Sequence, residues 1–363
     1  MAESFYKALD NSNDVVSTRT LLHEAIPLTG SIVSGTYSDE NIKSYGHGMF
    51  QSIYDYPYLS SSANHIFDIT VGVGASSALT VASQATKKQN IYNQMAQVMM
   101  GYDVTGSILR FDDDGDLVSG GTKIDNAIFL NFARLLSKDE IKKGSFQLDL
   151  GVKQAHSYVK TVFDDNRILI KDISGSNGYL VNSPVGEYGI LYATGSLGTE
   201  TITGSAVDQN GRVKCGLIFY QAGICVLTSS VFGSLLSTAC QFDGPSSTIE
   251  GFDAVLTGST IDVAANMFRN RMYSLQFNNT VELNSTIYFC RIGHNEYNYS
   301  TNPTYLSGSK IRVKTNTSDM PISYITTIGL YSDNNELLAV AKLSEPLKKT
   351  NNTEFTIRTR LDY

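Results

Sequence analysis

The chain has 363 residues, of which 42% are hydrophobic and 17% are charged, and its formal net charge is −7. This composition excludes an intrinsically disordered chain, and the length is sufficient for two or three domains with hydrophobic cores. The acidic balance argues against a nucleic-acid-binding surface, which needs a basic stripe, and the longest apolar run, residues 216–227, is too short to span a bilayer.

The four cysteines, at positions 215, 225, 240 and 290, have no metal-ligand spacing. Three of them lie in apolar runs, where a thiol behaves as a small hydrophobic group. The first five residues carry no basic and apolar targeting pattern. We therefore expect four free thiols in a reducing compartment.

The first 150 residues show mixed patterns. Residues 17–26 predict a short helix that stops before Pro27, and residues 65–71 predict a strand. Residues 86–101 predict a longer helix capped by Gly101. Its expected apolar face is made of Ile91, Met95, Val98 and Met99.

A second long helix is predicted over residues 125–136, and a strand over residues 145–150. The inward residues of this helix are expected to be Ile128, Phe129, Phe132, Leu135 and Leu136. Ser137 and Glu140 match a capping box, which predicts a short third helix that ends at Gly144.

Beyond residue 150 the patterns indicate mainly strands. Residues 162–170 predict two strands around an Asp-Asp-Asn turn, and residues 216–227 predict a buried hairpin that turns at residues 221–223. A helix is expected over residues 262–273, with Val263, Met267 and Met272 on one side. The remaining predicted strands cover residues 280–292, 310–314, 322–331, 336–343 and 354–363.

The last predicted strand alternates strictly between apolar and polar residues. Phe355, Ile357, Thr359, Leu361 and Tyr363 share one face, and Thr356, Arg358, Arg360 and Asp362 share the other. A period of two describes a strand with one buried and one solvated face. The fold class predicted is α+β and predominantly β: a mixed region over residues 1–150, a β-rich domain over 151–275 and a β-sandwich-like domain over 276–363.

Residues 112–116, Asp-Asp-Asp-Gly-Asp, are the densest acidic cluster. Such a cluster can bind Ca²⁺, but the spacing to a bidentate Glu that completes a calcium loop is absent. A hairpin turn between residues 107–111 and 117–118 explains the same residues without a metal, and we favour it. We therefore expect no metal site and no cofactor.

The sequence also offers no catalytic motif. The histidines at positions 23, 47, 65, 156 and 294 match no metal-ligand pattern, and no nucleophile turn of the Gly-x-Ser-x-Gly type occurs. Four tyrosines are the candidate interaction residues: Tyr297, Tyr299, Tyr305 and Tyr331. The first three lie around Asn302-Pro303, where they either contact a neighbouring subunit or pack over their own domain, and the sequence leaves both interpretations open.

The C-terminal hairpin resembles a known family. It reads Ile-Gly-Leu-Tyr at residues 328–331, a polar turn, Leu-Leu-Ala-Val-Ala-Lys-Leu at residues 337–343 and Pro346, and it is similar to the attachment domains of phage tail-fibre proteins. Residues 284–291, 296–305, 90–97 and 138–146 are also similar to structural proteins of tailed phages, notably of marine myoviruses.

The resemblance implies a non-enzymatic component of a tail, baseplate or tail fibre. The implied partners are other virion proteins and further copies of the chain in a symmetric oligomer, with no nucleic acid and no membrane insertion. The implied location is the virion, assembled in the host cytoplasm. Two alternatives stay open: a carbohydrate-binding adhesin, in which tyrosine rings stack on sugars, and a tail-associated hydrolase.

Overall fold

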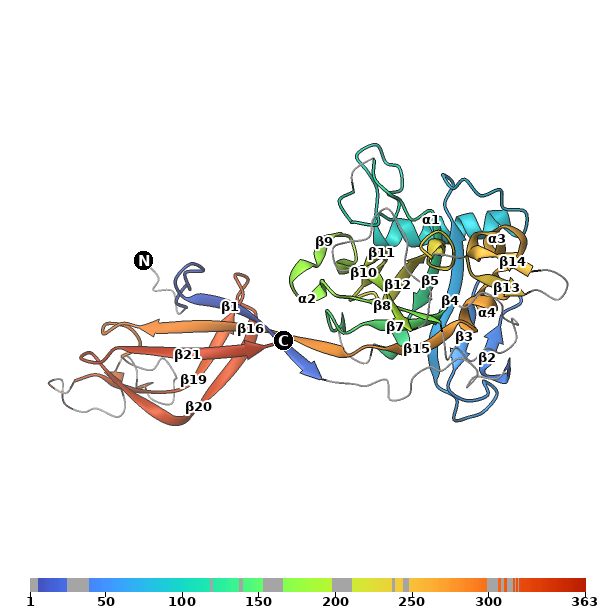
Figure 1. Ribbon diagram of the computed structural model, residues 1–363. Helices are drawn as coiled ribbons and strands as arrows, with labels where there is room; N and C mark the ends of the chain where they lie inside the picture. The colour runs from blue at the N-terminus through green and yellow to red at the C-terminus, as the bar shows by residue number, and fades with distance from the viewer. Residues whose placement is uncertain are drawn as a thin grey trace. The chain divides into compact units, whose positions relative to one another are not determined.

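The computed structural model describes residues 6–24, 39–117, 120–136, 140–152, 166–197, 211–236, 239–243, 248–298, 306–307, 310–311, 316, 318 and 320–363. The contacts divide the chain into two compact units (Figure 1). Unit 1 consists of Met1–Leu21 and Glu282–Tyr363, and unit 2 consists of Leu22–Val281.

Unit 2 is built on an 11-stranded antiparallel sheet. Its strands, in spatial order, are β15 (Met272–Gln276), β7 (Gln147–Gly151), β8 (Arg167–Lys171), β10 (Gly186–Leu197), β11 (Val213–Phe219), β12 (Ile224–Thr228), β5 (Asn126–Asn131), β4 (His65–Val73), β3 (Gln51–Tyr54) and β2 (Ile42–Ser44), with β9 (Leu180–Ser183) paired to β10. The predicted strand over residues 65–71 is confirmed by β4, and the predicted hairpin over residues 216–227 by β11 and β12, which turn at residues 220–223.

The prediction of a helix over residues 125–136 is wrong. Residues 126–131 form β5, which pairs with β4 on one side and β12 on the other, and a short 3-10 helix, η2 (Ala133–Leu135), follows. Ala127, Ile128, Phe129 and Leu130 are all fully buried because both faces of this central strand are covered. A strand that is buried on both faces gives a continuous apolar run, which a helix can also give. The expected third helix is also wrong at its end, since Glu140–Ile141 form strand β6, and residues 137–139 lie outside the described part.

The predicted helix over residues 86–101 is confirmed as α1 (Ala85–Met99), with Gly101 at φ 80° after its end. Its apolar face differs from the expected one by about a residue: Ile91, Tyr92, Ala96 and Met99 are buried, while Val98 is 57% exposed. Helix α1 packs on β4 (Figure 1). Gly72 of β4 permits this close approach, because a Cβ there would lie 3.0 Å from the backbone nitrogen of Tyr92 and 2.9 Å from the ring of Phe129.

A buried lysine joins α1 to helix α3 (Gly251–Gly258). Lys88 is completely buried, and its Nζ donates to the carbonyl oxygens of Leu256 at 2.6 Å and Ser259 at 2.7 Å. These carbonyls belong to the C-terminal end of α3, where a cation is favourable. Burial lowers the pKa of Lys88 to about 8.

Helix α4 (Ile261–Arg269) covers most of the predicted helix over residues 262–273, but Met272 begins β15 instead. The other short elements of unit 2 are η1 (Asp39–Asn41), α2 (Gly175–Gly178), η3 (Ser229–Phe232) and the hairpin β13 (Gln241–Asp243) with β14 (Thr248–Glu250). The first strand predicted over residues 162–170 lies mostly outside the described residues, and the second is β8.

Unit 1 contains two main antiparallel sheets. The strand order of the first sheet is β1 (Val15–Glu24), β16 (Asn279–Ile292) and β21 (Phe355–Asp362). The first residues of β16 belong to unit 2, where they pair with β6. In the second, β19 (Ile322–Tyr331) and β20 (Leu337–Thr350) form a long hairpin (Figure 1). A short pair, β17 (Leu306–Ser307) and β18 (Lys310–Ile311), is also present.

The prediction of a helix over residues 17–26 is wrong, because residues 15–24 form β1. Val15, Val16 and the threonines at positions 18 and 20 are β-branched residues, which favour strands. The alternation of the last strand is confirmed over β21: Phe355, Ile357 and Leu361 are half-buried and Thr359 is buried, while the residues between them are exposed. Tyr363, predicted on the same face, follows the end of the strand and is 71% exposed.

The described part of the chain is predominantly β, as predicted, since strands take up 45% of it and helices 16%. The three predicted domains stay a prediction. The sheet of unit 2 takes strands from both sides of residue 150. The predicted domain boundary at residue 150 therefore runs through one sheet. The four cysteines are free, and no helix in the described part of the chain has the length and apolar character needed to cross a membrane.

Candidate functional site

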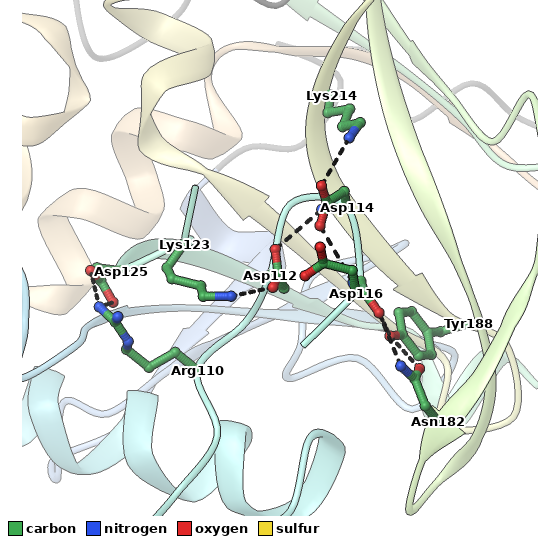
Figure 2. A network of polar contacts seen from close by, with 10 residues as sticks. Arg110, Asp112, Asp114, Asp116, Lys123, Asp125, Asn182, Tyr188 and Lys214 are labelled. Carbon is green, nitrogen blue, oxygen red and sulfur yellow. Dashed lines mark hydrogen bonds and ion pairs between the residues drawn. The ribbon is translucent and has the colours of Figure 1, made fainter. Parts of the chain in front are cut away.

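The acidic loop, residues 112–116, lies in unit 2 between two lysines (Figure 2). Carboxylate oxygens of Asp112, Asp114 and Asp116 all lie within 4.8 Å of one another. Lys123 Nζ makes an ion pair with the fully buried carboxylate of Asp112, and Lys214 Nζ lies 3.5 Å from Asp114 Oδ2.

The lysines already supply positive charge where a metal ion would bind. Burial raises the pKa of Asp112, and the hydrogen bond from Lys123 acts against this rise. Residues 111 and 113 exchange backbone hydrogen bonds with residues 122 and 124, and Val118 of the predicted turn lies outside the described residues. A divalent ion would have to displace Lys123, so this geometry favours a structural loop.

One histidine of unit 2 lies beside a serine and an aspartate. His65 Nε2 is 2.6 Å from Asp68 Oδ1, and the hydroxyl of Ser52 donates to the same oxygen at 2.5 Å. A serine nucleophile needs its hydroxyl on the histidine, which accepts the proton. Here the aspartate lies between the other two, so the three side chains tie β3 to β4 and are not arranged for nucleophilic catalysis.

A second polar network lies around Lys143. Its Nζ is 2.9 Å from Glu140 Oε1 and 2.7 Å from Glu187 Oε2, and it also lies over the ring of Tyr220. Tyr220 donates to Asp172 Oδ2 at 2.8 Å. Burial raises the pKa of Asp172, with hydrogen bonds from Gly144 and Tyr220 acting against the rise. These groups cross-link β6, β10 and β11.

The predicted interaction tyrosines fall into two groups. Tyr299 and Tyr305 lie outside the described residues. Tyr297 and Tyr331 are described, and they are 45% and 43% exposed. Both belong to unit 1.

The loop that carries Tyr297 is fixed by two lysines. Lys349 is completely buried, and its Nζ donates to the carbonyl oxygen of His294 at 3.1 Å and to Asn298 Oδ1 at 2.8 Å. Lys7 Nζ lies 2.6 Å from Glu296 Oε2, and this hydrogen bond lowers the pKa of Glu296. Tyr297 has φ 53°, so its backbone is held in the left-handed region.

Tyr331 lies on the β19–β20 hairpin, within a larger apolar surface. Its ring centroid is 4.8 Å from that of Tyr6, and its strand partner is Leu337. Gly329, two residues before it, leaves room for this ring: a Cβ at Gly329 would lie 2.9 Å from the Tyr331 ring and 3.2 Å from Leu337 Cδ1. The strand partner of Gly329 is Val340.

We call this surface the hairpin patch and define it by five exposed side chains. They are Tyr6 (49% exposed), Tyr331 (43%), Leu337 (52%), Leu338 (68%) and Val340 (54%). Of these five residues, the sequence patterns pointed only to Tyr331. The strand pairing shifts register between Leu330 and Tyr331, and this shift leaves the consecutive residues Leu337 and Leu338 exposed. The sequence signal of the shift is that the apolar run Leu337–Val340 does not alternate with polar residues.

The hairpin patch belongs to a unit in which residues 6–18, 283–298 and 320–363, whose side-chain burial the structure describes, include no fully buried apolar side chain. The buried side chains in these ranges are polar: Ser285, Thr286, Lys349 and Thr359. They are hydrogen-bonded, for example Thr286 to Tyr363 at 3.2 Å and Ser285 to Arg360 at 2.9 Å. The apolar side chains in these ranges are half-buried or exposed.

Comparison with protein-family models, with curated proteins and with solved structures finds no match for this chain.

Proposed function

We propose that this chain is a non-enzymatic structural protein of a tailed-phage particle, a tail, baseplate or tail-fibre attachment component that acts by assembly with other virion proteins and with further copies of itself. The observation that carries the proposal is the lack of a fully buried apolar side chain among residues 6–18, 283–298 and 320–363, the part of unit 1 whose side-chain burial the structure describes. The C-terminal hairpin, whose sequence resembles tail-fibre attachment domains, lies in this same unit.

The physical reason to expect assembly is that the apolar side chains of unit 1 are incompletely buried. An apolar side chain contributes about 1.5–3 kcal/mol only when it is removed fully from water. Half-buried strands such as β21, with Phe355, Ile357 and Leu361 all partly exposed, gain only part of this in a single chain. A contiguous exposed apolar surface marks a protein–protein interaction site. Association with other subunits would complete the burial of unit 1.

The polar networks of unit 2 fit the same function. The lysines at the acidic loop and at Glu140 neutralise the carboxylates beside them, so these groups stabilise the unit and do not form an open site. The net charge of −7 favours protein partners over nucleic acid. In this proposal unit 2 is a rigid body and unit 1 provides the contacts.

Mass spectrometry of purified particles from a culture that produces the chain tests the proposal. We expect the full chain in the particles at a fixed copy number relative to the major capsid protein. A chain that is present in infected cells but absent from the particles would contradict a structural role.

A variant comparison makes this test specific to unit 1. Leu338→Lys places a charge in the hairpin patch, and Val98→Lys places the same charge on an exposed apolar position of unit 2 (57% exposed, against 68% for Leu338). We expect Leu338→Lys to be left out of particles when it competes with the natural chain, and Val98→Lys to be incorporated normally. Equal incorporation of the two would argue that unit 1 does not carry the contacts.

A further inference from the structure

A short segment of unit 1, residues 6–8, lies on both predicted interaction tyrosines that the structure describes. The ring of Tyr6 packs on that of Tyr331, with 4.8 Å between the centroids. Lys7 reaches the other tyrosine. Burial raises the pKa of Tyr297, and the charge and the backbone hydrogen bond of Lys7 act against this rise, so Lys7 lies beside the Tyr297 hydroxyl. Two adjacent residues therefore cover part of the surface that the proposed assembly would use.

The surface under this segment is firmly held. Glu296 pairs with Lys7 at 2.6 Å, and it also accepts the backbone N–H of Gly293 at 2.8 Å. The completely buried Lys349 fixes the same loop by hydrogen bonds. Tyr331 belongs to the paired strand β19. The loop and the strand are thus tied to unit 1 by contacts that do not involve the segment.

The segment itself is held by exposed side chains. Tyr6 is 49% exposed, and the side chains of Lys7 and Glu296 are 39% and 41% exposed. An ion pair between exposed side chains is weak, and salt screens it. Residues 6–8 also belong to no helix or strand. Of the two sides of this contact, the segment is therefore the one that can move.

The chain is fixed again shortly after the segment. The Asp10 carboxylate accepts hydrogen bonds from the backbone N–H of Ser12 at 3.0 Å and from Asn13 Nδ2 at 2.6 Å. The carbonyl oxygen of Asp14 accepts the backbone N–H of Phe289 in β16 at 2.8 Å. The segment can therefore swing away without disturbing the sheet that contains β1.

We propose that residues 6–8 are a displaceable strap, which covers Tyr297 and Tyr331 in the free chain and is released when an assembly partner binds there. The strap and the partner compete for the same two rings. The apparent affinity of unit 1 for a partner is then reduced by the fraction of chains in which the strap is closed. This inference rests on the proposed assembly function and names a regulation of its contact surface.

Tryptophan fluorescence tests whether the strap opens. The chain contains no tryptophan, so Tyr6→Trp gives a single probe on the strap, and Tyr102→Trp is a control in unit 2 at a position that is 53% exposed. Raising NaCl from about 0.1 M to about 1 M shortens the Debye length from about 10 Å to about 3 Å. We expect this salt to raise acrylamide quenching of the strap probe about twofold and to leave the control unchanged, because the Lys7–Glu296 pair is screened.

The variant Tyr6→Trp/Lys7→Gln removes the ion pair and keeps the length of the side chain. We expect its quenching at low salt to equal that of Tyr6→Trp at high salt. Quenching that responds neither to salt nor to Lys7→Gln would overturn the strap.

Incorporation into particles tests the competition with a partner. We expect Lys7→Gln to be favoured about twofold over the natural chain when the two compete, because its strap is open more often. Lys87→Gln makes the same charge change on an exposed residue of unit 2 and should be incorporated like the natural chain. Equal incorporation of the two variants, or a depletion of Lys7→Gln, would overturn the competition and leave the assembly function standing. Absence of every chain from the particles would contradict the assembly function itself.

Discussion

The two units of this chain bury their apolar residues to very different degrees. In unit 2 a single core contains completely buried aromatic side chains, among them Phe67, Phe129 and Phe219. In residues 6–18, 283–298 and 320–363 of unit 1, whose side-chain burial the structure describes, the buried side chains are polar and the apolar ones are half-buried or exposed. A strand in which apolar and polar residues alternate does not by itself form a core, because a second surface must cover its apolar face.

The largest expected effect on the free energy of unfolding is the difference between two Phe→Ala substitutions, one in each unit. Phe129→Ala in β5 removes a fully buried ring that contacts Phe111 at 5.7 Å between centroids, and we expect a loss of about 3–5 kcal/mol. Phe289→Ala in β16 removes a half-buried ring, and we expect a loss of about 1 kcal/mol in the dilute chain. Calorimetry on dilute protein measures both; similar losses would remove the contrast between the units.

The next largest effect on the free energy of unfolding is expected from Lys88 in unit 2 and Lys349 in unit 1, which are both completely buried. Lys88→Ala leaves the carbonyl oxygens of Leu256 and Ser259 buried without their donor, and we expect a loss of about 2–4 kcal/mol. Lys349→Ala removes donors to a loop of unit 1, and we expect about 1–2 kcal/mol. Urea unfolding checks both values, with the neighbouring exposed Lys87→Ala expected to stay within about 0.5 kcal/mol.

Lys88 should add a pH-dependent contribution to the stability of unit 2. The folded-state pKa of Lys88 is lowered to about 8 by burial from an ordinary value of 10.5, so between these values the unfolded chain binds the extra proton. The contribution of Lys88 to stability therefore rises with pH over this range, by on the order of 2 kcal/mol. The thiols of Cys215 and Cys225 contribute in the opposite direction, because burial raises their pKa. Melting temperatures of the natural chain and of Lys88→Met at pH 8 and pH 10 isolate the lysine: the variant should lose more stability, or gain less, between the two pH values. An equal change with pH in both proteins would contradict the contribution of Lys88.

The smallest effect is expected at the exposed apolar residues. In dilute monomeric protein, Leu338→Lys and Val98→Lys should each change the unfolding free energy by less than about 0.5 kcal/mol. A large loss in the Leu338 variant would mean that the hairpin patch stabilises the single chain, and it would no longer be free for a partner.

Sequence patterns predicted β19 and β20 of unit 1 and the hairpin β11–β12 correctly because polar turns separate these strands clearly. They failed at β5, where Ala127–Leu130 is buried on both faces and carries no period of two. They also failed at β1, whose pairing with β16 joins residues far apart in the chain. No local pattern reports such a long-range pairing.

The candidate surface was predictable only in part. Tyr331 stood out as an aromatic residue in the C-terminal hairpin, but the contact that Tyr6 makes with it joins opposite ends of the chain. Leu337, Leu338 and Val340 lie in a predicted strand, and their exposure on consecutive positions follows from the register shift beside Tyr331.

Hydrogen–deuterium exchange at two protein concentrations tests most directly whether association completes unit 1. At a concentration where the chain is monomeric, amides of β19, β20 and β21 should exchange fast, while those of β4, β5 and β12 stay protected. Raising the concentration should protect the strands of unit 1 by at least tenfold and leave unit 2 unchanged. Strong protection of unit 1 in the monomer, equal to that of unit 2, would contradict the view that unit 1 depends on partners for its burial.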